Sequence, residues 1–122
     1  MRPGKPVMAG KINNTPIIGL PGNPVSALVC GYVFLKPLIR AMQGLERKST
    51  PRLKALCSNP IPENGSREHY MRAVLLPNGC LKPMENQDSA RLALLSDSNA
   101  LLIRPPHAKA IPADTLCEYI KI

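Results

Sequence analysis

A sharp passage from strand to helix is encoded by Gly19-Leu20-Pro21-Gly22-Asn23-Pro24-Val25-Ser26. The apolar, β-branched stretch at 16–20 indicates a strand, and we expect it to be buried. Gly22 gives the backbone freedom to turn, and Asn23 is a favoured N-cap. Pro24 falls at the first helical position, where its missing N–H costs nothing. The turn therefore predicts a helix that begins at Pro24.

This helix continues through residues 25–42, which are apolar almost all round, so we expect burial on most sides. Pro37 should kink the helix or restart it one turn later, and Gln43-Gly44 is a plausible end. The most apolar part, 25–35, has only 11 residues before Lys36-Pro37. This length favours a buried helix over a membrane span.

Short strands are predicted on both sides of this helix. Before it, 7–12 and 16–20 form a hairpin that reverses at Asn13-Asn14, since Asn tolerates positive φ. A linker at 46–51 places a domain boundary near 48. Strand-like pieces follow at 53–58, 67–76, 80–83, 100–104 and 115–120, with a hairpin turn at Pro77-Asn78-Gly79 and a short helix at 89–95 capped by Asp88 or Ser89.

These elements predict two parts. Residues 1–48 form an α/β fragment, a strand hairpin plus a helix. Residues 49–122 contain several short strands with turns between them, which suggests a small barrel or sandwich. The predicted fold class is an α/β fragment followed by a small, barrel-like all-β domain.

The charge balance favours an anionic partner. The chain of 122 residues has a net charge of +8. Residues 1–45 contain no acidic residue and five basic ones, namely Arg2, Lys5, Lys11, Lys36 and Arg40. Nucleic acid and anionic small molecules both fit such a balance. Nucleic acid is disfavoured, because Phe34 and three tyrosines are the only aromatic residues available for stacking.

The cysteines and histidines suggest no metal or catalytic centre. The four cysteines form no C-x-x-C pair and lie among apolar neighbours, as buried free thiols do. No apolar run follows Met1, so we expect no signal peptide and a reducing cytoplasmic location. Neither His69 nor His107 has a nucleophile or carboxylate at a suggestive spacing, so we expect neither to be catalytic.

The turn at 21–24 has two interpretations. A helix N-terminus presents free N–H groups and a partial positive charge, Gly22 lets an anion approach the backbone, and Ser26 adds a hydroxyl donor. The turn is then a phosphate or oxyanion site. The alternative is an ordinary, well-capped helix start.

Several motifs in this order resemble the MoeA family, which includes the gephyrin E domain. The resemblance rests first on Arg2-Pro3-Gly4-Lys5-Pro6 followed by a hairpin and the segment at 19–26. It continues through Tyr70-Met71-Arg72-Ala73, Asn86-Gln87-Asp88-Ser89 and Asn99-Ala100-Leu101-Leu102-Ile103. It therefore covers nearly the whole chain.

The resemblance implies part of a molybdopterin molybdenumtransferase. Such an enzyme takes adenylylated molybdopterin (molybdopterin-AMP), removes AMP and inserts molybdate at the dithiolene sulfurs, with a divalent cation, usually Mg²⁺. It works as a homodimer, with neither nucleic acid nor membrane as a partner. Residues 1–48 resemble the end of its molybdopterin-binding α/β domain, and 49–122 its C-terminal β domain, domain IV.

The resemblance also implies substrate-binding residues: Arg2, Lys5, Pro21, Gly22, Asn23, Pro24, Ser26, Arg72 and Ser89. Arg2 replaces a lysine of the family, keeping the charge but presenting a planar fork suited to an anion. Asp88 replaces a glycine and adds negative charge near the expected site. The family's catalytic carboxylates would precede Met1, so we expect no catalytic residue and no metal ligand in this chain.

Three functional hypotheses follow. The first is part of a molybdenumtransferase, incomplete for catalysis by itself. The second is a non-catalytic module that binds molybdopterin or another protein. The third is a basic nucleic-acid-binding domain, which the scarcity of aromatic residues disfavours.

Overall fold

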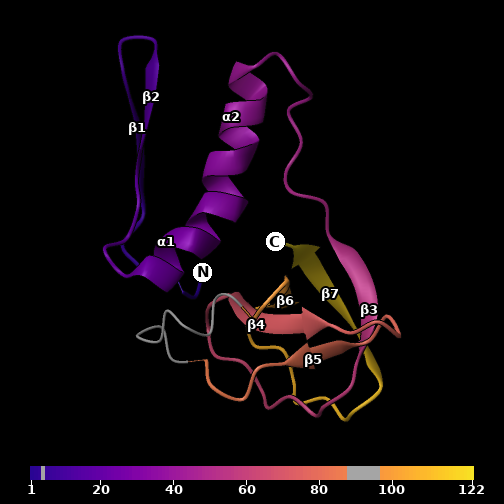
Figure 1. Ribbon diagram of the computed structural model, residues 1–122. Coiled ribbons are helices and arrows are strands. Elements are labelled where there is room, and N and C mark those ends of the chain that lie inside the picture. Colours follow the sequence, from indigo (N-terminus) through magenta and orange to yellow (C-terminus); the bar gives the residue numbers. More distant parts are fainter. Residues whose placement is uncertain (4, 88–96) are drawn as a thin grey trace.

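A computed structural model describes residues 1–3, 5–87 and 97–122, and it consists of a hairpin, a helix and a barrel (Figure 1). The first part contains β1 (Met8–Ile12), β2 (Thr15–Gly19), α1 (Pro24–Cys30), the π-helical turn η1 (Gly31–Leu35) and α2 (Lys36–Met42). The second contains β3 (Leu53–Cys57), β4 (His69–Leu75), β5 (Leu81–Pro83), β6 (Ala100–Arg104) and β7 (Thr115–Lys121). The predicted fold class is confirmed, and the predicted short helix at 89–95 lies outside the described residues.

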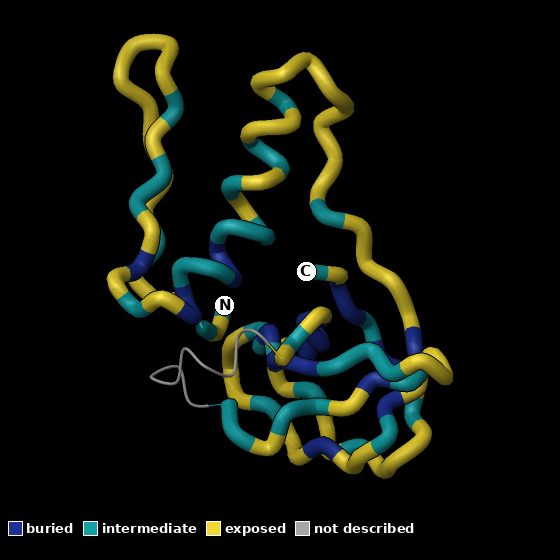
Figure 2. Tube along the Cα trace, viewed as in Figure 1, coloured by how far each residue is buried: buried dark blue, intermediate teal, exposed yellow. Residues whose placement is uncertain are grey.

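The hairpin forms as predicted but is not buried. β1 pairs antiparallel with β2 from Met8↔Gly19 to Ile12↔Thr15. Asn13 makes the reversal with a φ of 52°, in the left-handed region that asparagine tolerates. All of β1 is exposed, and no residue of β2 is fully buried. The expectation of a buried strand is wrong, because the two-stranded ribbon stands to one side of the helix and away from the barrel (Figure 2).

Residues 24–42 form one continuous helical run despite Pro37. Immediately before the proline, the N–H of Lys36 donates to the carbonyl of Gly31, five residues back. Such a π-turn widens the helix where proline has no N–H and its ring crowds the preceding carbonyls. α2 begins at Lys36 with Pro37 in its first turn, so the predicted restart one turn after Pro37 does not occur.

The helix is less buried than predicted. Only Val25, Ser26, Val29 and Cys30 are buried, all in α1, whereas no residue of η1 or α2 is. The first two turns rest on the barrel, and the rest of the helix projects away from it (Figure 2). Apolar side chains of the projecting part are therefore exposed in this chain, for example Phe34 at 40% and Met42 at 65%.

The continuous helix also removes the length argument against a membrane span. Its 19 residues are long and apolar enough to cross a bilayer, judged by length and composition alone. Core helices of soluble proteins pass the same test, so this observation is weak evidence for a membrane.

The barrel is closed, in the order β3-β5-β4-β6-β7. β4, β6 and β7 pair antiparallel, and five residue pairs join β3 to β7. Closure occurs between β3 and β5 through the parallel pair Cys57↔Leu81. The predicted turn at 77–79 connects β4 to β5, with Gly79 at a φ of +85° where a side chain would be strained.

Strand β6 is buried on both faces, and this links the barrel to the helix. Ala100 and Leu102 belong to the core inside the barrel. Leu101 and Ile103, which point the other way, pack in a second cluster with Val29 of α1. A strand buried on both sides reads as a continuous apolar run, as residues 100–103 do.

The four cysteines are free, as predicted. Cys30, Cys57 and Cys117 are buried, whereas Cys80 is only half-buried at the end of the 77–79 turn. Burial raises the pKa of the Cys30 and Cys117 thiols, so both favour the neutral form.

The first prediction concerns the barrel core. We expect Leu102→Ala to lower the free energy of unfolding by about 2–5 kcal/mol, because Leu102 is fully buried inside the barrel and its truncation leaves a cavity. Leu116→Ala is the matched control on β7, where the leucine is 57% exposed. Urea unfolding of both variants measures the difference, and equal losses would contradict the assignment of the core.

Candidate functional site

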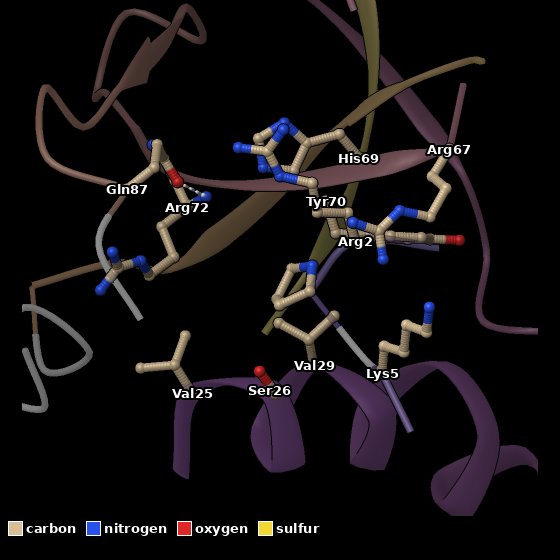
Figure 3. Close-up of a pocket in the computed structure, with 11 residues that line it drawn as sticks. Arg2, Lys5, Val25, Ser26, Val29, Arg67, His69, Tyr70, Arg72 and Gln87 are labelled. Carbon is tan, nitrogen blue, oxygen red and sulfur yellow. Dashed lines mark hydrogen bonds between the residues drawn. The ribbon is translucent and has the colours of Figure 1, made fainter. Parts of the chain in front are cut away.

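A polar cavity of about 360 Å³ lies where the first turns of α1 meet the N-terminal segment and the start of β4 (Figure 3). Four parts of the chain that are distant in sequence therefore form its walls, since Gln87 after β5 also lines it. The lining residues are Arg2, Pro3, Lys5, Val25, Ser26, Val29, Arg67, His69, Tyr70, Arg72 and Gln87.

Backbone hydrogen bonds fix Arg2 at this cavity. Its N–H donates to the carbonyl of Glu68 at 2.6 Å, and its carbonyl accepts from the N–H of Tyr70 at 2.7 Å. Arg2 thereby forms a parallel bridge with His69 at the start of β4. The pairing places a guanidinium from the start of the chain against the barrel.

Four positively charged side chains line the cavity: Arg2, Lys5, Arg67 and Arg72. None of the described residues that line it carries a carboxylate. Within the part of the chain that the structure describes, no carboxylate lies at ion-pair distance from Arg2, Lys5 or Arg67. Such a concentration of guanidinium and ammonium groups suits a phosphate-like or other tetrahedral oxyanion.

Arg72 is held by the segment that follows β5. Its side chain is only 2% exposed, and one guanidinium nitrogen donates to the carbonyl of Asn86 at 3.0 Å. The amide of Gln87 replaces a neighbouring strand, because its Oε1 accepts from the N–H of Arg72 at 2.9 Å. Its Nε2 donates to the carbonyls of Arg72 and Met84 at 2.9 and 2.8 Å. These bonds fix the wall that carries Arg72 (Figure 3).

Glu68 is the carboxylate next to His69 in sequence, but it pairs outside the cavity lining. One of its oxygens accepts from Arg52 at 3.0 Å, and the other accepts from the Tyr70 hydroxyl at 3.1 Å. Burial, followed by the charge of Glu68, raises the pKa of Tyr70, so the phenol stays protonated and able to donate. Arg52 thus offsets the negative charge of Glu68 beside this wall.

His69 is neutral at neutral pH. Burial first, and then the positive charges of Arg2 and Arg67, lower the pKa of its imidazole from 6.5 to about 4. Each cause disfavours a further positive charge in an already cationic cavity. A neutral imidazole can both donate and accept a hydrogen bond.

The helix start is capped as predicted. Asn23 Oδ1 accepts from the N–H groups of Val25 and Ser26 at 3.0 and 3.2 Å, and Pro24 has no N–H. These first-turn donors are therefore occupied by the cap, and an anion would have to displace it to reach them. Ser26 is buried, and its hydroxyl points into the cavity (Figure 3).

The structure gathers some of the proposed substrate-binding residues and separates others. Arg2, Lys5, Ser26 and Arg72 line the cavity. Pro21, Gly22, Asn23 and Pro24 are absent from its lining and instead shape the turn that presents Ser26. Ser89 lies outside the described residues.

Sequence reasoning missed four polar lining residues, namely Arg67, His69, Tyr70 and Gln87. His69 was set aside because no nucleophile or carboxylate lies at a suggestive spacing. The parallel pairing of Arg2 with β4 brings His69 and Arg2 together at the cavity. No local sequence pattern predicts that pairing. For Gln87, the available signal was its place beside the Asn86-Gln87-Asp88-Ser89 motif.

This cavity does not fit Mg²⁺. Magnesium takes oxygen ligands, usually including a carboxylate, whereas the lining offers four cations. Among the described residues there is also no group of three or more His, Cys, Asp or Glu side chains that would hold a metal ion.

A protein-family model described as the MoeA C-terminal region, domain IV, matches residues 54–122, which is more than half of the chain. The chain belongs to the MoeA family. The matched region begins within β3 and runs to the last residue of the sequence, so it covers the barrel.

Individual MoeA relatives extend the likeness to the hairpin and helix. Molybdopterin molybdenumtransferase 2 of Mycobacterium tuberculosis is 34% identical over 116 residues, covering 94% of this chain and 29% of that protein. A molybdopterin molybdenumtransferase of Haemophilus influenzae is 40% identical over 79 residues, covering 64% of this chain and 20% of that protein. The chain thus spans less than a third of the length of these MoeA relatives.

A solved structure shows the same fold over nearly the whole chain. The crystal structure of a molybdopterin biosynthesis moeA protein from Pyrococcus horikoshii OT3 matches with a TM-score of 0.77 at 23% sequence identity. It covers 99% of this chain and 30% of that one. The hairpin, the helix and the barrel are therefore a MoeA arrangement and not one peculiar to this sequence.

The helix cap makes a second prediction. We expect Asn23→Ala to lower the free energy of unfolding by about 1 kcal/mol, because the N–H groups of Val25 and Ser26 lose their acceptor. Asn23→Ser keeps a capping oxygen and should retain most of the stability. Thermal unfolding at neutral pH compares the two, and an equal loss in both would show that the cap is not the cause.

The buried imidazole makes a third prediction. We expect the free energy of unfolding to fall as the pH is lowered from 6.5 to about 4, because His69 takes up a proton in the unfolded chain but resists it in the folded one. His69→Gln should remove this part of the pH dependence. His107→Asn, in an exposed loop at a φ of 56°, should not. Urea unfolding at both pH values tests this, and identical slopes in all three proteins would contradict it.

Proposed function

We propose that this chain is the C-terminal part of a molybdopterin molybdenumtransferase and that its cavity binds an anionic group of adenylylated molybdopterin or molybdate. The observation that carries the proposal is the set of four cations around one cavity, with no carboxylate among the described residues that line it. Names of the relatives supply the substrate class, since several are called molybdopterin molybdenumtransferases.

The division of labour within the chain follows from its two parts. We assign residues 1–48 to the end of a molybdopterin-binding α/β domain and 49–122 to the C-terminal β domain. The family match at 54–122 and the exposed segment from Gln43 to Ser49 support a boundary near 48. The cavity lies where the two parts meet, so each contributes to binding.

The residues of this chain bind and orient, and carry out no bond cleavage. Arg2 and Arg67 offer paired N–H donors to an oxyanion, Lys5 adds charge, and Ser26 adds a hydroxyl. Mg²⁺ supplies electrostatic stabilisation of phosphate chemistry when bound to such an enzyme, and no described residue cluster of this chain would hold it. Its ligands, and the homodimer expected for the complete protein, belong to the proposal for a longer molecule.

The alternative is a non-catalytic module that binds molybdopterin or a protein partner. The described lining residues are cations, neutral polar groups and apolar groups without a carboxylate, which favours binding without turnover for this chain alone. An assay for AMP release from adenylylated molybdopterin with Mg²⁺ and molybdate distinguishes the two. Sustained release by the 122-residue chain would contradict its incompleteness.

Binding by calorimetry is the fourth prediction. We expect adenylylated molybdopterin to bind the chain, and Arg2→Ala to weaken binding about tenfold or more through the loss of a charge-assisted hydrogen bond. Arg47→Ala, in the exposed linker, removes the same charge away from the cavity and should change affinity little. Equal loss of affinity in both variants would mean that only the net charge of the chain matters, and it would contradict the assignment of the binding site to this cavity.

A further inference from the structure

His69 occupies an unusual position for an imidazole. It lies at the first residue of β4, opposite Arg2 in the parallel bridge, and its side chain lines the cation-rich cavity. Figure 3 shows the imidazole and the Arg2 guanidinium on the same wall. A group that titrates near neutrality in water is therefore built into a binding surface made of permanent positive charges.

The charged groups around His69 come from every neighbouring element. Arg2 from the N-terminal segment and Arg67 from the loop before β4 act on it directly. Arg104 of β6 pairs with His69 across the sheet. Its guanidinium group donates hydrogen bonds to the carbonyls of Lys109 and Pro62 at 2.6 and 3.3 Å. Glu68 is paired with Arg52. The other charged residues among those described in the lining are Lys5 and Arg72. The lining residues from α1 are Val25, Ser26 and Val29, which do not titrate.

We propose that His69 is a ligand of the bound oxyanion and takes up a proton from solvent when a doubly charged anion enters the cavity. The proposal rests on the anion-binding function proposed above and adds a residue, a proton and a preference for dianions to it. No bond other than N–H is formed at the imidazole, and the proton comes from the buffer.

The physical reason is that a dianion reverses the local field. In the empty cavity, burial and two guanidinium groups hold the pKa of His69 at about 4. An opposite charge within about 4–6 Å raises a pKa by about 1–3 units. A shift of about 2 units would bring the imidazole to half-protonation near pH 6 and give the anion a further charged donor. Binding of a dianion thus adds a positive charge to the site.

Two measurable consequences follow. At pH 6 the complex should take up about half a proton, since the free imidazole is almost wholly neutral there. Affinity for a dianion should be about fourfold higher at pH 5.5 than at pH 7.5 for the same shift of about 2 units. A monoanion, with half the charge, should produce a smaller change in both.

Sulfate is the probe, because it is tetrahedral, doubly charged over this pH range and releases no proton of its own. The intact 122-residue chain is titrated from pH 3.5 to 8 by NMR, with sodium sulfate or with sodium chloride of equal ionic strength. We expect sulfate to raise the pKa of His69 by more than 1 unit. The imidazole of His107, which does not line the cavity, is the internal control in the same spectra.

Calorimetry of sulfate binding at pH 6, in two buffers of different ionisation enthalpy, counts the protons. Uptake by the wild-type chain that disappears in His69→Gln and persists in His107→Asn would support the proposal. The NMR titration needs no variant, so a His69→Gln chain that fails to fold does not remove the test.

The outcomes separate this inference from the function on which it rests. Sulfate that binds without moving the pKa of His69, or with proton uptake that survives His69→Gln, would overturn the inference and leave the anion site standing. No sulfate binding at all would overturn the anion site and the inference with it.

Discussion

Two backbone hydrogen bonds between Arg2 and the start of β4 define the geometry of the cavity. They connect the N-terminal segment to the barrel at Glu68 and Tyr70. Arg2 lies outside the named strands, and this pairing fixes its backbone. Here the paired backbone holds it beside His69, and the other walls of the cavity are arranged around this contact.

The same face of the barrel carries both the apolar contact to the helix and the polar cavity. Tyr70 pairs with Ile103, and Arg72 pairs with Leu101, so alternate residues of β4 and β6 point toward α1. Leu101, Ile103 and Tyr70 pack with Val29, whereas Arg72 reaches the cavity at the edge of this cluster. Apolar packing therefore excludes water beside the cations, which strengthens their interaction with an anion.

The sequence predicts local features better than distant pairings. Asn23 as a cap, Asn13 as a reversal and Gly79 in a turn depend on a few neighbouring residues, and the structure has each of them. The burial of the helix was overestimated. An apolar composition shows that a helix has surface to bury, but not which part of the chain packs against that surface. His69 was missed for a related reason, since its cavity is created by a long-range bridge to Arg2. Of the four cations, the motifs supplied Arg2, Lys5 and Arg72, whereas Arg67 carried no motif.

The positive charge around the cavity also acts at a distance. A cluster of cations in a concave, partly desolvated surface concentrates anions from solution before any hydrogen bond forms. The chain as a whole carries a net charge of +8, which reinforces this attraction. Capture of a small anion is then governed by an encounter rate that ionic strength controls, because the field decays over about 8 Å at physiological salt. Salt thus sets how quickly the cavity fills, whereas the hydrogen bonds inside it set how long the anion stays.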